Sequence, residues 1–162
     1  DVVIKPLFGS EGRGMVRASD EDTARRVLIA LELGRYVYYL QEFVPHGNED
    51  IRVFVIGDRV SSAMVRRGTS WRTNVAQGAA AVPLSPDQTL CELALRAARA
   101  VGADYAGVDV LVGPSGYTVI EVNGIPGWQG LQNVTQFNIA DAIVDYALTQ
   151  AVIRPTAPQE RT

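Results

Sequence analysis

The sequence predicts an α+β fold, in which antiparallel strands and helices are segregated along the chain. Two hairpins carry this prediction, one in residues 51–66 around Gly57-Asp58 and one in residues 107–123 around the turn at 113–116. The first 43 residues add the order strand, loop, strand, helix, strand. This order lacks the regular βαβ alternation of a doubly wound sheet.

Composition limits the class of protein. The chain has 162 residues, 47% hydrophobic and 20% charged, which is typical of one soluble domain or of a domain plus a fragment. It shows neither a run of about 20 apolar residues nor a signal peptide, so we expect a cytoplasmic protein without a membrane partner. A net charge of −3 argues against nucleic acid as a partner. Cys91 is the single cysteine, which excludes an internal disulfide.

The first third of the chain predicts short strands around one helix. Residues 2–5, an apolar run closed by Lys5, indicate a short buried strand, and "GMVRAS" indicates a second. Ser19 is predicted to cap a helix that has acidic residues in its first turn and ends at Gly34. The aromatic-rich residues 36–43 predict the next strand. The chain begins at Asp1, directly before a strand, so we expect a fragment of a longer protein.

The rest of the chain alternates hairpins with helices. Residues 44–50 and 67–81 are polar and predict irregular segments. Ser85 and Gln88 resemble a capping box that opens a helix ending at Gly102. After a loop through "GIPGWQGLQN", the last helix is predicted from about Asn138 to Gln150, followed by a frayed tail at 151–162.

Lys5 is the only lysine among fifteen basic residues, and it stands just before Gly9, Gly12 and Gly14. Lysine is a compact point charge that suits a single phosphate oxygen, whereas arginine presents a planar fork. A glycine-rich turn lets backbone N–H groups approach an anion. The pattern predicts a phosphate site, with chance survival of one lysine in an arginine-rich chain as the alternative.

The second hairpin predicts a metal site. Glu121 and Asn123 are two residues apart on a strand, so both point to one face. If residues 114–116 form a three-residue loop, Gly113 pairs with Tyr117 and Asp109 lies opposite Glu121. Facing carboxylates repel unless a cation lies between them, and oxygen ligands favour magnesium. The alternative is that these acids face solvent.

The other face of this hairpin is predicted to belong to the core. The residues expected there are apolar: Val108, Val110, Val112, Ile120 and Val122. Such a division, with acids on one side and aliphatic residues on the other, is typical of a half-buried sheet.

Three further side chains suit anionic groups. Arg66 falls on the apolar side of its strand, where a charge needs a partner unless it snorkels past the strand end. Arg72 and Asn74 follow in "WRTN", whose donors suit phosphate oxygens. Trp71 is interpreted as a packing residue, and His46 receives no role.

Taken together, "VVIKP", "GSEGRGM", "LQEFV", "DIRVFVIGDRV", "RTN", "GVDVLV" and "IEVNGIPG" resemble the ATP-grasp superfamily, and in particular its RimK-like amino-acid ligases. The motifs stand in family order over about residues 2–149. The resemblance implies a partial ATP lid in residues 1–43 and a carboxy-terminal catalytic subdomain with an antiparallel sheet core in residues 44–150. It also implies that the family's amino-terminal domain is absent from this chain.

The resemblance implies a role for each site residue. ATP would be held by Lys5 beneath the loop of Gly9, Ser10, Gly12 and Gly14, by Gln41, Glu42 and Phe43 at the adenine, and by Asp50 at the ribose. Phosphate or the reaction intermediate would be contacted by Arg66, Arg72 and Asn74. The Mg²⁺ ligands would be Asp109, Glu121 and Asn123, with Mn²⁺ as an alternative metal. Arg52 would face phosphate or a substrate carboxylate, and Trp128 would line the acceptor pocket or pack.

The implied reaction is ATP-dependent ligation of a carboxylate to an amine through an acyl phosphate. The implied donor is glutamate, and the acceptor carboxylate lies on a protein tail or a small coenzyme. Homo-oligomerisation of the full-length protein is left open. The alternatives from other classes are a nucleotide-binding module without turnover and a phosphotransferase built on the same fold.

Overall fold

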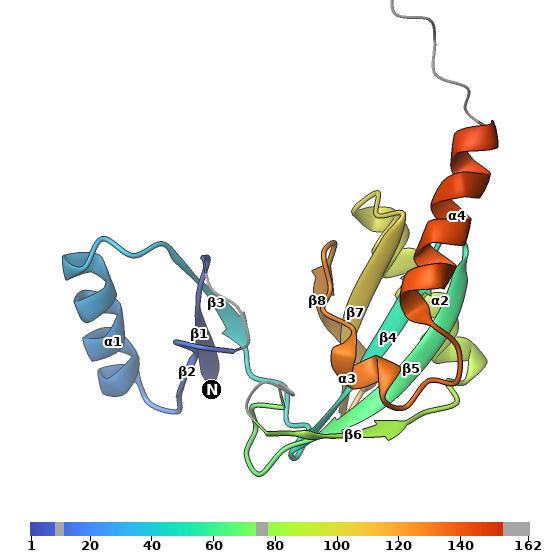
Figure 1. Cartoon of the computed structure of the whole chain (residues 1–162). Helices are drawn as coiled ribbons and strands as arrows, with labels where there is room; N and C mark the ends of the chain where they lie inside the picture. Colours follow the sequence, from blue (N-terminus) through green and yellow to red (C-terminus); the bar gives the residue numbers. More distant parts are fainter. Residues whose placement is uncertain (9–11, 74–77, 154–162) are drawn as a thin grey trace, which may run out of the picture.

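The computed structural model describes residues 1–8, 12–73 and 78–153 and contains two antiparallel sheets (Figure 1). The first has the order β2-β1-β3, with β1 at Val2–Pro6, β2 at Val16–Ala18 and β3 at Tyr38–Glu42. The second has the order β6-β5-β4-β7-β8, with β4 at Glu49–Ile56, β5 at Arg59–Arg67, β6 at Ala80–Pro83, β7 at Tyr105–Gly113 and β8 at Gly116–Asn123. The α+β prediction is confirmed.

Four helices accompany these sheets: α1 at Glu21–Leu33, α2 at Gln88–Ala100, α3 at Gln129–Gln132 and α4 at Ile139–Ile153. Figure 1 shows α1 beside the first sheet, and α2 and α4 with the second. None of the helices in the described residues is long and apolar enough to cross a membrane.

The sequence missed β6 and α3. β6 overlaps the end of the segment predicted to be irregular, at residues 80 and 81, and pairs with β5 at the sheet edge. Its four residues are too few for an alternating pattern, so pairing with β5 rather than local sequence identifies it as a strand. α3 is a single turn in the loop after β8.

Aspartates rather than serines cap the first two long helices. Asp20 accepts a hydrogen bond from the Thr23 N–H at 2.8 Å, and Asp87 accepts one from the Leu90 N–H at 2.8 Å. The predicted caps, Ser19 and Ser85, were therefore wrong by one and two residues. A carboxylate adds charge at the positive end of the helix dipole, which a hydroxyl does not.

The predicted end of α2 and the predicted start of α4 agree more closely with the structure. Gly102 has a φ of 65° directly after α2, as expected of a glycine that ends a helix. Asn138 caps α4, because its side-chain oxygen accepts from the Ala140 N–H at 2.9 Å. α4 continues to Ile153, three residues past the predicted Gln150, and residues 154–162 of the predicted tail lie outside the described residues.

Both faces of the five-stranded sheet are covered. One face packs against α2 through a cluster that includes Val53, Val55, Val108 and Leu90, all 0% exposed. The other face packs Phe54, Ile56 and Met64 against Leu131 and Ile139, which belong to α3 and α4. The two clusters follow the strand alternation, because residues 53 and 54 point to opposite faces.

The predicted pairing of Asp109 with Glu121 is correct, although the predicted turn is wrong. Gly113 pairs with Gly116 rather than Tyr117, so the turn has two residues and not three. A register shift between Asp109 and Val110 then leaves one β8 residue, Ile120, without a partner. This bulge restores the same register that a three-residue loop would have produced.

The bulge also changes which residues reach the core. Val119, not Ile120, pairs with Val110 and packs on the α2 side, whereas Ile120 lines the cavity described below. Val112 is 53% exposed near the hairpin turn. Val108, Val110 and Val122 lie in or against the core as predicted.

Candidate functional site

A cavity of about 580 Å³ lies between the two sheets. Lys5 lines it from β1, and Asp109, Glu121 and Asn123 line it from β7 and β8. The lone lysine and the predicted acid patch therefore meet across one cavity. Its walls also include these predicted site residues: Gly12, Gln41, Glu42, Phe43, Asp50, Arg66 and Arg72.

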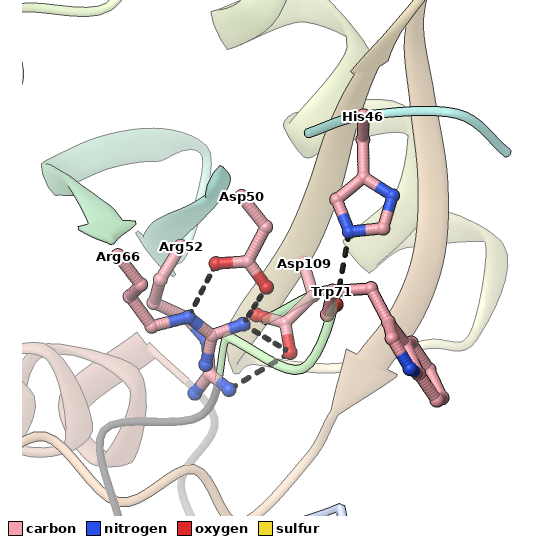
Figure 2. Close-up of polar contacts among 6 residues, drawn as sticks. All are labelled: His46, Asp50, Arg52, Arg66, Trp71 and Asp109. Atoms are coloured by element: carbon pink, nitrogen blue, oxygen red, sulfur yellow. Dashed lines mark hydrogen bonds and ion pairs between the residues drawn. The ribbon is translucent and has the colours of Figure 1, made fainter. Parts of the chain in front are cut away.

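Four charged side chains come from adjacent strands at the centre of the second sheet (Figure 2). Asp50 is paired with Arg66 across β4 and β5, and Arg52 is paired with Asp109 across β4 and β7. Asp50 and Arg52 are two residues apart on β4, so both point to the same face. That face is also the one that Phe54 and Met64 share farther along the strands.

The four side chains form one chain of ion pairs, in the order Asp50, Arg66, Asp109 and Arg52. Arg66 donates from Nε and Nη2 to the two oxygens of Asp50, each at 2.6 Å, and its Nη2 also lies 3.1 Å from Asp109 Oδ2. Arg52 donates to both oxygens of Asp109, with its Nη2 at 2.9 Å from Oδ2. Arg66 is 4% exposed and Asp109 is 2% exposed. Snorkelling of Arg66 is thus excluded, because the buried charge has its partners here.

Electrostatics keep Arg66 charged. Burial lowers the pKa of its guanidinium, but Asp109 and Asp50 more than offset this and hold the pKa above its usual value. A buried cation beside a cavity is a strong ligand for an anion, because little water competes with it.

Asp50 binds Arg66 in the structure, and its predicted contact with a ribose stays a prediction. Both of its carboxylate oxygens accept hydrogen bonds from Arg66, and the residue is 3% exposed. A carboxylate that accepts two parallel hydrogen bonds fixes the plane and position of the guanidinium. We therefore interpret Asp50 as the residue that holds Arg66 in place.

Asp109 and Glu121 form the predicted cross-strand acid pair. Desolvation and the nearby Asp109 raise the pKa of Glu121, while Lys5, Arg52 and Arg66 act in the opposite direction. Within the described residues, no group of three or more His, Cys, Asp or Glu side chains could hold a metal ion. Asp109, Glu121 and Asn123 line the same cavity and together offer two carboxylates and an amide oxygen. Two carboxylates and an amide oxygen fit Mg²⁺.

Lys5 faces these acids from the other sheet. Desolvation lowers the pKa of its ammonium, and Glu121 and Asp109 act in the opposite direction. Its Nζ lies 5.8 Å from the centre of the Tyr39 ring, on the neighbouring strand β3. The ammonium is therefore partly desolvated and near the acid pair, as a phosphate ligand opposite a metal would be.

The predicted adenine edge lies at the end of β3. Gln41, Glu42 and Phe43 all line the cavity. The Phe43 N–H already donates to the Asp1 carbonyl at 3.1 Å, so this donor is used within the sheet. The ring of Phe43 packs edge-on against Trp71, 6.2 Å between centroids. Because the Phe43 N–H is used in this way, the Phe43 carbonyl oxygen is the main-chain group that could accept a hydrogen bond from a ligand.

His46 was given no role from sequence, yet it lines the cavity and joins two segments. One ring nitrogen lies 2.7 Å from the Val44 carbonyl oxygen. The other lies 3.0 Å from the Trp71 carbonyl oxygen (Figure 2). This places the loop that carries Arg72 beside the connection between β3 and β4. No local pattern distinguishes this histidine from one in a solvated loop.

The remaining predictions divide into three groups. Trp71 packs against Phe43, as predicted, and Trp128 packs edge-on against Phe54 at 6.4 Å between centroids, which favours packing over the acceptor pocket. Gly12 and Gly14 have φ values of 72° and 77°, but only Gly12 lines the cavity. Gly9, Ser10 and Asn74 lie outside the described residues.

The family model and the curated relatives agree on one family. The model of the RimK-like ATP-grasp domain matches residues 1–147. The chain is 42% identical over 156 residues to the tetrahydromethanopterin:alpha-L-glutamate ligase of Methanococcus maripaludis, covering 93% of this chain and 53% of that protein. It is also 42% identical over 149 residues to the alpha-aminoadipate–LysW ligase LysX of Sulfurisphaera tokodaii, covering 88% and 52%. The chain thus spans about half the length of the curated relatives it matches.

A solved structure shares the arrangement of elements. The ATP-grasp ligase PsnB, in complex with a minimal precursor, Mg and ADP, superimposes with a TM-score of 0.63 at 26% identity. The match covers 93% of this chain and 46% of that one. The match therefore extends over both sheets.

The ion pairs predict a difference between neighbouring acids of β4. Asp50→Asn leaves the buried Arg66 without its main partner and should lower the free energy of unfolding by about 3–5 kcal/mol. Glu49→Gln is the matched control: Glu49 pairs with Arg67, and both side chains are more than half exposed, so its loss should cost only about 0–1 kcal/mol. Urea denaturation of both variants measures the difference, and equal losses would contradict the assignment of Asp50.

The raised pKa of Glu121 predicts a pH-dependent stability. The carboxyl group of Glu121 binds its proton more tightly in the folded protein than in the unfolded chain. Ionised Glu121 therefore destabilises the ligand-free fold at a pH above its raised pKa. The penalty is lost as the pH falls through that value toward the ordinary value of 4.5. Glu121→Gln should raise the Tm by about 1–2 °C at pH 7 in metal-free buffer, with no difference below pH 4.5. Thermal unfolding across this range checks it, and a lowered Tm at pH 7 would contradict it.

Proposed function

This chain belongs to the RimK-like ATP-grasp family, and we propose that its cavity binds Mg·ATP in a protein that ligates a carboxylate to an amine. The observation that carries the proposal is the meeting of Lys5 with the Asp109–Glu121 pair in one cavity. A triphosphate needs cations on one side and a metal-bridged contact on the other, and these residues supply both.

Each part of the cavity has a task in this proposal. Asp109, Glu121 and Asn123 would hold Mg²⁺, or Mn²⁺, which when bound neutralises charge on the phosphates. Lys5 binds phosphate oxygens from β1, while Gly12 allows the backbone to approach them.

Two arginines stabilise the charge that spreads over the transferred phosphoryl group: Arg66, which Asp50 holds in place, and Arg72. The adenine lies near Gln41, Glu42 and Phe43.

The chemistry follows from what the cavity provides. A substrate carboxylate attacks the γ-phosphorus of ATP, the bond to the β-phosphate oxygen breaks, and ADP leaves. The acyl phosphate then reacts with an amine at its carbonyl carbon, phosphate leaves, and the amine gives up a proton. Positioning and electrostatics suffice for both steps, so no nucleophilic side chain is required.

Glutamate is the proposed amino-acid donor. The relative from Methanococcus maripaludis is named as an alpha-L-glutamate ligase that acts on tetrahydromethanopterin, and LysX is named for alpha-aminoadipate and LysW. The acceptor of this protein is accordingly proposed to be a carboxylate on a small coenzyme or on a protein tail. Cytoplasmic location, where ATP and these acceptors occur, is part of the same proposal.

Lys5 should be protected by nucleotide. Because it is the only lysine and its pKa is lowered by desolvation, an amine-reactive reagent labels few other sites besides the amino terminus. Mg·ADP should slow its acetylation, read by mass spectrometry, and Lys5→Met should weaken Mg·ADP binding by about tenfold or more, as loss of a charged hydrogen bond of about 1.5–3 kcal/mol implies. Labelling that proceeds at the same rate with Mg·ADP would count against the phosphate contact.

The reaction is tested with the intact protein that carries this chain. Incubation with Mg·ATP, glutamate and candidate acceptors should yield an amide, ADP and phosphate in equal amounts. A stable phosphorylated product would instead indicate a phosphotransferase, and binding of Mg·ADP without any product would indicate a nucleotide-binding module. Lys5→Met in the same assay should lose product formation.

A further inference from the structure

Two guanidinium groups contact a carboxylate that the proposed function assigns to the metal. Asp109 receives both hydrogen bonds of Arg52 and an additional contact from Arg66 at 3.1 Å. A metal ion approaching Asp109 must share these oxygens with the two cations or displace one of them. The structure therefore raises the question of which arginine can leave.

The two arginines differ in how firmly they are held. Arg66 is anchored by the bidentate contact with Asp50, and its side chain is 5% exposed. Among the described residues, Asp109 is the one carboxylate with which Arg52 forms an ion pair, and the Arg52 side chain is 11% exposed at the cavity wall. Release of Arg52 breaks one pair, whereas release of Arg66 would also leave Asp50 without its partner.

Gly107 provides the space in which Arg52 lies over the sheet. A Cβ at this position would lie 2.8 Å from Arg52 Nη1 and 2.9 Å from the Pro126 side chain. Gly107 pairs with Phe54 on β4 and with Asn123 on β8. The guanidinium therefore occupies a slot between β7 and the loop after β8, next to Asn123.

Cations already line the cavity before any ligand binds. Those that act on the acid pair are Lys5, Arg52 and Arg66, and the lining also contains Arg13 and Arg72. A divalent cation added alone brings excess positive charge close to two guanidinium groups. A metal that arrives with phosphates brings a net negative ligand, to which a released arginine can turn.

We propose that Arg52 occupies the place of the metal at Asp109 in the ligand-free protein and transfers to the nucleotide phosphates when metal and nucleotide enter together. The inference rests on the proposed function, because it needs a metal at Asp109 and a phosphate in the cavity. Arg52 thereby couples the two binding events: bare metal competes with the Arg52 side chain, whereas metal with nucleotide gives that side chain a new anion. Such couplings are typically about 5–150-fold in affinity.

The experiment measures Mn²⁺ binding through the electron paramagnetic resonance signal of the free ion, with and without ADP. Arg52→Gln should bind Mn²⁺ alone about fivefold or more tightly than the parent, because the competing cation is gone. The gain in Mn²⁺ affinity caused by saturating ADP should fall by about fivefold or more in the same variant. A purely structural arginine would instead weaken both affinities.

Two further variants complete the test. Arg67→Gln removes an arginine from the same hairpin whose partner Glu49 is exposed, and it should leave Mn²⁺ and ADP binding unchanged. Arg52→Lys keeps the charge but loses the two-pronged contact, so it should give an intermediate Mn²⁺ affinity even if Arg52→Gln does not fold. Circular dichroism melting establishes which variants are folded.

The outcomes separate the two proposals. If the parent binds Mn·ADP but folded Arg52 variants bind Mn²⁺ alone no more tightly than the parent, the exchange of Arg52 is overturned and the proposed function stands. If the parent binds neither Mn²⁺ nor Mn·ADP, the proposed function itself is overturned.

Discussion

The site depends on one constraint, the lateral alignment of charged residues across β5, β4, β7 and β8. Arg66 lies beside Asp50, Arg52 beside Asp109, and Asp109 beside Glu121. A slip of one residue in any of these strands would turn its charged side chain toward the aliphatic cluster beneath α2. The burial of that cluster therefore keeps the charges on the cavity side.

The same constraint explains why an irregular hairpin serves the site. The two-residue turn at Pro114-Ser115 alone would place Asp109 opposite Ile120, which carries no charge. The bulge at Ile120 restores Glu121 to that place and turns Ile120 toward the cavity. Bulges of this kind re-aim side chains next to functional sites. The local disruption of pairing thus positions the acid pair.

Buried ion pairs contribute little net stability, because the desolvation of the charges offsets their attraction. The cluster of Asp50, Arg52, Arg66 and Asp109 is therefore better explained by the positioning of guanidinium groups at the cavity than by a contribution to folding stability. Asp50 fixes the Arg66 guanidinium before a ligand arrives, so little reorganisation of that group would accompany charge development on a phosphate. The opposite wall of the cavity belongs to a separate sheet, from which Lys5 lines the same cavity.

Sequence patterns identified the type of most elements and several residues of the site. Alternation in 107–112 and 117–123 identified the two strands and placed Glu121 and Asn123 on one face, because a strand has a period of two. The Asp109–Glu121 pairing was reached through a three-residue turn, and it holds because the bulge at Ile120 compensates for the shorter turn. The solitary Lys5 beside glycines indicated an anion site for the same local reason. The caps at Asp20 and Asp87, the short strand β6 and the bulge were missed, since neighbouring sequence allows more than one choice at each.

What the sequence by itself determined is therefore local: strand faces, helix spans, and the chemistry of the residues at each position. Only the tertiary structure decided the partners. Asp50 proved to hold Arg66, Arg52 to lie on Asp109 above Gly107, and His46 to join two loop segments, because those contacts join residues 16, 57 and 25 positions apart. Pairings at such separations depend on strand order and register, which no local pattern records.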